Sequence, residues 1–195
     1  MRRLWLLVLL LAGAASVASA QARTHIGARL QLQSDGPPAL VFSVSNLLDD
    51  GDWLSALNNA SRIELHWSVS LSRSRAIFDV TGTPTEWNDY VEKIPTLDVF
   101  NYMEPSRGRL TTRAFNSLDS LKLLLGQEQQ INTPRTLAPG RWYYSVQLTV
   151  TADDRPDPNS KAQPLSAFQR LILGNGLSRT YGPQTTVTFV VPERQ

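Results

Sequence analysis

The sequence predicts a mainly β protein. We expect an antiparallel β-sandwich, immunoglobulin-like in general architecture, with two or three short helical insertions. Apolar and polar residues alternate with a period of two in several segments. These segments are rich in β-branched or aromatic residues and end near turn residues, and no alternating strand–helix–strand rhythm separates them. An open antiparallel sheet with helices on one side is the alternative architecture.

The first twenty residues have the features of a secretory signal peptide. Arg2 and Arg3 precede an apolar run, Leu4 to Leu11, and the small residues Ala18 and Ala20 form a cleavage motif. The run is shorter than the roughly 20 residues that a membrane-spanning helix needs. We therefore expect cleavage after residue 20 and a single domain over residues 21–195, with an uncleaved membrane anchor as the alternative.

Composition narrows the possible partners and cofactors. Without the two arginines of the leader, the remaining chain has 17 basic and 17 acidic residues, so no electrostatic argument favours nucleic acid. The chain has no cysteine, which excludes disulfides, thiolate metal sites and a lipid-anchoring cysteine. No later stretch is apolar enough to span a membrane. We expect a periplasmic or secreted protein without a cofactor.

The first strands form a predicted hairpin. The segment Ala28 to Gln33 alternates with Leu30 and Leu32 facing inward, and the turn residues Ser34 to Pro38 follow it. The next strand, Ala39 to Ser45, places three apolar side chains inward: Leu40, Phe42 and Val44.

Helical signals interrupt the strands twice. Asp52 is a candidate N-cap for a helix that carries Trp53, Leu54 and Leu57. Ser117 is the candidate N-cap of a second helix, which Gly126 would end. Its first turn contains Asp119, and its predicted buried stripe consists of Leu118, Leu121, Leu124 and Leu125.

The strongest strand signals lie in the middle and at the end of the chain. The predicted strands have these inward residues: Ile63, Leu65, Trp67, Val69 and Leu71; Trp142, Tyr144, Val146, Leu148 and Val150; Val187, Phe189 and Val191. Weaker strands are expected near 75–80, 97–102 and 109–115. The segment 152–164 is expected to be a polar loop, and 165–174 a helix or a strand. Tyr143 faces away from Trp142 and Tyr144, so this aromatic cluster is split by the pleat.

Few residues form a recognisable site. Arg107, Arg109 and Arg113 could bind phosphate or carboxylate, although an edge strand also uses positive side chains to discourage pairing. Tyr143 is the other weak candidate for ligand binding. His66 lies on the polar face of its strand, and no Gly-x-Ser-x-Gly motif accompanies it. Helix capping and an exposed turn explain the Asp clusters at 49–52 and 153–157 better than calcium does. We assign no catalytic residue and no metal ligand.

The order of these features resembles a bacterial exported family known as domain of unknown function 4390. The resemblance rests on "DWLSAL", "IELHWSVSLSRSR", "FNYMEPSRGRLTTRAFNSLDSLKLLLG" and "GRWYYSVQLTV", over roughly residues 26–158. The chain departs from the family pattern after Arg75, where it has "RAIFDV" instead of several aromatic residues. The resemblance implies an envelope location and suggests a link to envelope signalling.

Three functions remain open. We favour a non-catalytic periplasmic module that binds another envelope protein, because the chain has export features, several sheet strands and no usable catalytic group. A small-ligand or glycan binder is the alternative, because aromatic side chains suit such ligands and the chain contains Trp53, Trp67, Trp87 and Trp142. A hydrolase is third, and it would require His66 to lie in a pocket beside a nucleophile and an acid.

Overall fold

The structure is a computed structural model that describes residues 23–34, 36–59, 62–106, 109–153, 177–182 and 186–192. The expected signal peptide with Ala18 and Ala20, the candidate Arg107 and the segment 165–174 lie outside the described residues. Within the described ranges, the chain is mainly β, with two antiparallel sheets and two α-helices. This confirms the predicted fold class.

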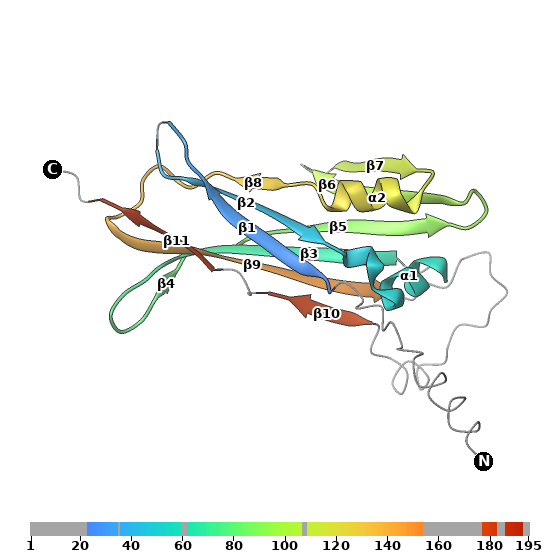
Figure 1. Cartoon of the computed structure of the whole chain (residues 1–195), viewed down its shortest axis with the longest axis horizontal. Coiled ribbons are helices and arrows are strands. Elements are labelled where there is room, and N and C mark those ends of the chain that lie inside the picture. Colours follow the sequence, from blue (N-terminus) through green and yellow to red (C-terminus); the bar gives the residue numbers. More distant parts are fainter. Residues whose placement is uncertain are drawn as a thin grey trace, which may run out of the picture.

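The larger sheet has eight strands, and its main path runs β10-β9-β3-β5-β6-β7 (Figure 1). Its strands are β3 (Arg62–Arg73), β4 (Val80–Thr81), β5 (Thr85–Ile94), β6 (Val99–Ser106), β7 (Arg109–Phe115), β9 (Gly140–Asp153), β10 (Ser178–Tyr181) and β11 (Thr186–Val191). The long strands β3 and β9 pair over twelve residues and form its centre. β10 and β11 follow each other along the outer side of β9.

The smaller sheet has the order β1-β2-β8 and lies across the larger one (Figure 1). Its strands are β1 (His25–Gln31), β2 (Ala39–Ser45) and β8 (Gln129–Ile131). The 3-10 helix η1 (Leu47–Asp49) and α1 (Gly51–Asn58) follow β2, and α2 (Leu118–Leu125) follows β7. α1 lies at one end of the molecule, while the loop that contains β4 protrudes at the other (Figure 1). Among the described residues, no helix is long and apolar enough to cross a bilayer.

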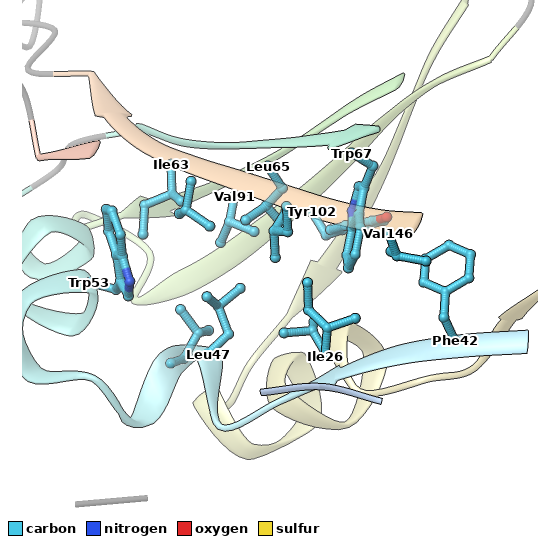
Figure 2. Close-up of a cluster of buried hydrophobic side chains, with 14 of the residues drawn as sticks. Ile26, Phe42, Leu47, Trp53, Ile63, Leu65, Trp67, Val91, Tyr102 and Val146 are labelled. Carbon is cyan, nitrogen blue, oxygen red and sulfur yellow. The ribbon is translucent and has the colours of Figure 1, made fainter. Parts of the chain in front are cut away.

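One apolar core fills the space between the two sheets (Figure 2). Phe42 from β2 meets Trp67 from β3 with ring centroids 5.4 Å apart, and Trp67 stacks on Trp87 from β5 at 6.0 Å. Trp53 from α1 closes the core at one end and is fully buried. The aromatic rings therefore join both sheets, and burial of rings of this size supplies much of the driving force for folding.

The alternation of apolar and polar residues correctly predicted which face of the strongest strands points into the core. In β2, β3, β9 and β11 the predicted inward residues are buried or pack against the core. The hairpin that joins β1 to β2 is also confirmed. In α2 the Ser117 side chain accepts a hydrogen bond from the Ser120 N–H, and Gly126 ends the helix. Leu121 is buried and the other three leucines of the predicted stripe pack against the core.

Several predicted boundaries were wrong. β1 begins at His25, so Ile26 is the buried residue and Leu32 lies in solvent beyond the strand. The first α-helix is capped by Asp50, which accepts a hydrogen bond of 3.0 Å from the Asp52 N–H. Residues 152 and 153, expected in a loop, belong to β9, and the rest of the segment expected as that loop lies outside the described residues.

Two weak strand predictions also fail in part. In the segment 75–80 only Val80 belongs to a strand, as the first residue of the two-residue β4. The strand expected from Leu97 begins at Val99, with Leu97 exposed in the preceding turn. The segment 109–115 is confirmed as β7. Sequence reasoning missed β5, β8 and β10. The missed β5 matters most, since it joins the centre of the larger sheet to the β6–β7 hairpin.

Candidate functional site

Tyr143 lies on the outer face of the larger sheet, as its position in β9 predicted. Its hydroxyl donates a hydrogen bond of 2.7 Å to Asp79 Oδ2 in the loop between β3 and β5. This hydrogen bond lowers the pKa of the Asp79 carboxyl, and the same bond raises the pKa of Tyr143. Tyr143 therefore supports the neighbouring loop, and its polar group is already engaged.

Arg109 and Arg113 lie on β7, the edge strand of the larger sheet. Both side chains are exposed, and Arg113 lies 3.7 Å from Glu104 on β6, a pair that is about half exposed. An exposed pair of this kind contributes little to stability. The structure does not bring these arginines together with Tyr143, which lies on β9, on the far side of β3, β5 and β6 from β7. The sequence-predicted candidates thus belong to two separate surfaces.

A half-open groove lies between the end of β2, η1 and α2. Its volume is about 500 Å³. Its lining combines apolar and charged side chains: Val44, Leu47, Leu48, Leu123 and Leu125 supply apolar surface, while Asp49, Asp119 and Lys122 supply charge. Lys122 pairs with Asp49, which also lines the groove. Sequence reasoning treated Leu125 as a packing residue and missed the groove, because a groove depends on how α2 packs against β2.

A buried carboxyl group is the second feature that the sequence did not reveal. Asp89 on β5 is 2% exposed and points to the inner face of the sheet, and its Oδ1 has no hydrogen-bond partner among the described residues. Burial raises the pKa of Asp89 to about 6, a hydrogen bond with Tyr102 lowers it, and the charge of Glu104 raises it further. The same environment raises the pKa of Tyr102. Asp89 does not line the groove beside α2, and we regard it as a structural group.

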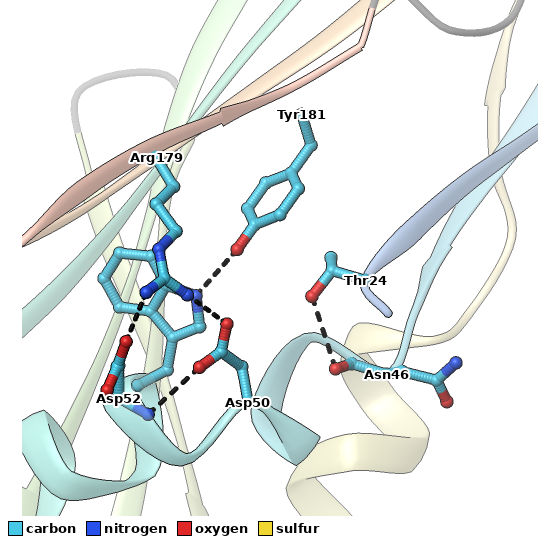
Figure 3. A network of polar contacts seen from close by, with 7 residues as sticks. Thr24, Asn46, Asp50, Asp52, Arg179 and Tyr181 are labelled. Carbon is cyan, nitrogen blue, oxygen red and sulfur yellow. Dashed lines mark hydrogen bonds and ion pairs between the residues drawn. The ribbon is translucent and has the colours of Figure 1, made fainter. Parts of the chain in front are cut away.

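The acidic residues at the N-terminal end of α1 form a polar network with β10 (Figure 3). Arg179 contacts both Asp50 and Asp52, and its guanidinium lies 5.7 Å from the centre of the Trp53 ring. The indole N–H of Trp53 donates a hydrogen bond of 2.9 Å to the Tyr181 hydroxyl. These carboxylates therefore cap α1 and pair with Arg179, which agrees with the helix-capping interpretation of this cluster. The second Asp cluster lies almost wholly outside the described residues.

The remaining candidates have structural partners. His66 Nδ1 lies 2.6 Å from Asn88 Oδ1 on the adjacent strand β5. Asn88 supplies neither a nucleophile nor a carboxylate, so this contact does not assemble a Ser-His-Asp arrangement. The tryptophans that suggested a sugar-binding face lie inside: Trp53 and Trp67 are buried, and Trp87 and Trp142 pack against the core.

Comparison of the chain with protein-family models, curated proteins and solved structures found no match. The geometry of the chain itself therefore carries the functional argument.

Proposed function

We propose that the chain is exported to the bacterial periplasm, is cleaved after Ala20, and binds an extended segment of another envelope protein along β7 without catalysing a reaction. Export rests on the sequence features of residues 1–20, and the envelope location agrees with the resemblance to family 4390. The proposal includes neither a cofactor nor a nucleic-acid partner. Its strongest support is the outer edge of β7, with which no described strand pairs.

β7 offers an unpaired strand edge to a partner. It pairs with β6 on one side, and no described strand pairs with its other side. Six of its seven residues are exposed, and only Phe115 at its end is partly buried. The edge of a strand presents backbone N–H and C=O groups, which an extended peptide can pair with by adding a strand to the sheet.

The charges of β7 favour one kind of peptide. Arg109 and Arg113 are four positions apart in β7, and side chains an even number of positions apart lie on the same face of a strand. In a second copy of this chain the same arginines would meet like charges, which disfavours edge-to-edge self-association. A peptide with acidic residues two or four positions apart would complement them, since oppositely charged neighbours across strands attract each other.

Capture from envelope extracts tests the proposal. The chain beginning at Gln21 should reproducibly retain one partner, and the double variant Arg109→Glu/Arg113→Glu should lose it. Arg29→Glu/Arg135→Glu is the matched control, because it reverses two exposed charges on other parts of the described surface. The proposal is wrong if no reproducible partner is captured and the protein runs alone, or if the control variant loses the partner equally.

A small apolar ligand in the groove between β2 and α2 is the second candidate function. The observation in its favour is a volume of about 500 Å³, which lies within the usual range for small-ligand sites. Ser45→Trp would fill the groove from the exposed end of β2. Ligands from an apolar panel should raise the melting temperature of the native chain and not that of Ser45→Trp. A panel that raises neither, or raises both equally, excludes this groove as the binding site.

A further inference from the structure

The loop between β3 and β5 ends in two adjacent exposed apolar side chains. Ile77 is 81% exposed and Phe78 is 79% exposed, and we call this pair the apolar tip. Figure 1 shows the loop protruding beyond the sheets, at the end opposite α1. Single exposed apolar residues are common on protein surfaces, but an adjacent bulky pair on a protruding loop indicates a surface that something else covers.

The apolar tip is held in a defined shape. Asp79 Oδ1 accepts a hydrogen bond of 3.1 Å from the Arg75 N–H, while Asp79 Oδ2 accepts the hydrogen bond from Tyr143. Behind the tip, the Ser72 hydroxyl donates to the Thr81 hydroxyl over 2.9 Å. A loop that is already ordered loses little conformational freedom when it binds, so more of its apolar contact energy contributes to affinity.

Two arginines lie at the base of the tip. Arg75 precedes Ile77 by two residues, and the Arg141 carbonyl accepts a hydrogen bond of 2.9 Å from the Ser74 N–H. Both arginine side chains are exposed, and neither has a carboxylate partner within the described residues. The nearby acid, Asp79, already receives hydrogen bonds at both oxygens. The tip thus combines bulky apolar groups with available positive charge.

We propose that the apolar tip inserts into the surface of an anionic lipid bilayer, with Arg75 and Arg141 contacting the lipid phosphates. Apolar side chains that enter the boundary between headgroups and acyl chains, beside basic side chains that meet anionic lipid, form a recurrent way of binding a membrane surface. Guanidinium groups also suit phosphate, because they can donate two parallel hydrogen bonds to it.

The small surface area that the apolar tip can bury favours a bilayer over a protein as its partner. A stable protein–protein interface buries about 1,200–2,000 Å² in total. Two side chains of this size supply roughly 300–400 Å² between them. A bilayer needs no matching surface of that extent, because each inserted side chain gains from leaving water by itself. The site is separate from the β7 edge, so this inference does not rest on the proposed function.

Vesicle co-sedimentation tests the inference with the chain beginning at Gln21, which keeps all the described core residues, from Ile26 to Val191. The chain should bind phosphatidylglycerol-containing vesicles more tightly than phosphatidylcholine vesicles, and binding should weaken as salt rises. Ile77→Ser/Phe78→Ser should lower the partition coefficient by about tenfold or more. Arg75→Gln/Arg141→Gln should abolish the preference for anionic vesicles.

A matched control removes two exposed leucines elsewhere. Leu32→Ser/Leu97→Ser replaces side chains that are 88% and 69% exposed, and it should bind vesicles like the native chain. Unchanged melting temperatures of all variants would show that folding is intact. The inference is overturned if the native chain binds neither vesicle type, if the serine tip variant binds like the native chain, or if the control loses binding equally. A concentration-dependent dimer that the serine tip variant abolishes, without vesicle binding, would instead assign the tip to a protein contact and overturn the proposal.

Discussion

Tyr143 and Asp79 connect the central strand β9 to the protruding loop through a hydrogen bond of 2.7 Å. The other oxygen of the same carboxylate accepts a hydrogen bond from the backbone of Arg75. Asp79 therefore ties together the sheet and both sides of the loop. Tyr143, which the sequence left as a lone aromatic residue on the outer face, is the anchor of this arrangement.

Replacing Tyr143 with Phe should loosen the loop and leave the core intact. The melting temperature should change by only a few degrees, because the lost hydrogen bond is exposed. Hydrogen exchange of the Arg75 amide should become faster, since Asp79 would no longer be fixed by Tyr143. Exchange measured by NMR can check this, with the Gly82 amide, which donates to the Leu71 carbonyl, as an internal reference. An unchanged rate at Arg75 would show that Tyr143 does not fix the loop.

The same contact has a defined pH dependence. In the folded state the Asp79 carboxyl has a pKa below the unfolded value of 3.8. The stabilisation of the folded state by this carboxylate is therefore present above about pH 4 and is lost as pH falls through the folded pKa. In Tyr143→Phe the Asp79 pKa should move back toward its ordinary value, because the largest cause of the shift is gone. A carboxyl titration followed by NMR can measure this, and an equal pKa in both proteins would contradict it.

Gly140 at the start of β9 should not tolerate a side chain. Its φ is +138°, and an added Cβ would lie 2.9 Å from Arg73 Nε. We expect Gly140→Ala to lower the free energy of unfolding by about 1–3 kcal/mol. Gly36→Ala is the matched control, because Gly36 has φ +135° and nothing within 4 Å of its added Cβ. Urea unfolding should show the larger loss at Gly140, and equal losses would exclude the contact with Arg73 as a cause.

The sequence predicted most clearly those strands whose inward positions are all apolar. In β3 and β9 every second residue enters the core, so the period of two was clear. β5 was missed because its inward positions include Asp89 and Lys93 beside Val91, which hides the alternation. Conversely, Ile77 and Phe78 favoured a strand by residue type but lie in solvent. Residue type predicts which segments can form strands, while burial depends on neighbours that the sequence does not show.

The candidate surfaces were predictable to different extents. The sequence anticipated an exposed edge strand with arginines, and β7 is at the edge of the sheet. It did not anticipate the groove beside α2 or the contact between Tyr143 and Asp79, because each joins segments that are more than sixty residues apart. Contacts of this range follow from the packing of sheets and helices, and no local pattern reports them.

Arg179 should be the ion-pairing residue that matters most for holding β10 to α1. It contacts two carboxylates and the Trp53 ring at once, and such networks stabilise more than isolated surface pairs. Arg179→Ala should lower the free energy of unfolding by about 1 kcal/mol. Arg179→Lys should not restore it, because a single ammonium cannot replace the planar fork of the guanidinium. Arg29→Ala is the control.

The control removes a single exposed pair, Arg29 with Glu128, and should be close to neutral. Urea unfolding measures both losses under the same conditions. Equal losses for Arg179→Ala and Arg29→Ala, or full rescue by lysine, would show that the network contributes no more than a surface pair.

Asp89 should make the protein less stable at neutral pH than at mildly acidic pH. Its pKa is about 6 in the folded state against an ordinary value of 3.8, so the folded state holds an extra proton between these values. Stability from this group therefore falls as pH rises from about 4 to about 6 and stays low above that. A shift of this size corresponds to about 3 kcal/mol at most. Asp89→Asn keeps the shape, cannot ionise, and should gain about 1–3 kcal/mol at pH 7.5.

Unfolding by urea at pH 4.5 and 7.5 separates this effect from other titrations. The difference between Asp89→Asn and the native chain should be large at pH 7.5 and small at pH 4.5, because the native carboxyl is mostly protonated at the lower pH. Glu128→Gln removes an exposed acid instead and should follow the native chain at both values. The buried carboxyl would be excluded as the cause if Asp89→Asn kept the native pH dependence. Since Asp89 lies beside the stacked Trp67 and Trp87, their fluorescence should report its ionisation between pH 5 and 7 in the native chain alone.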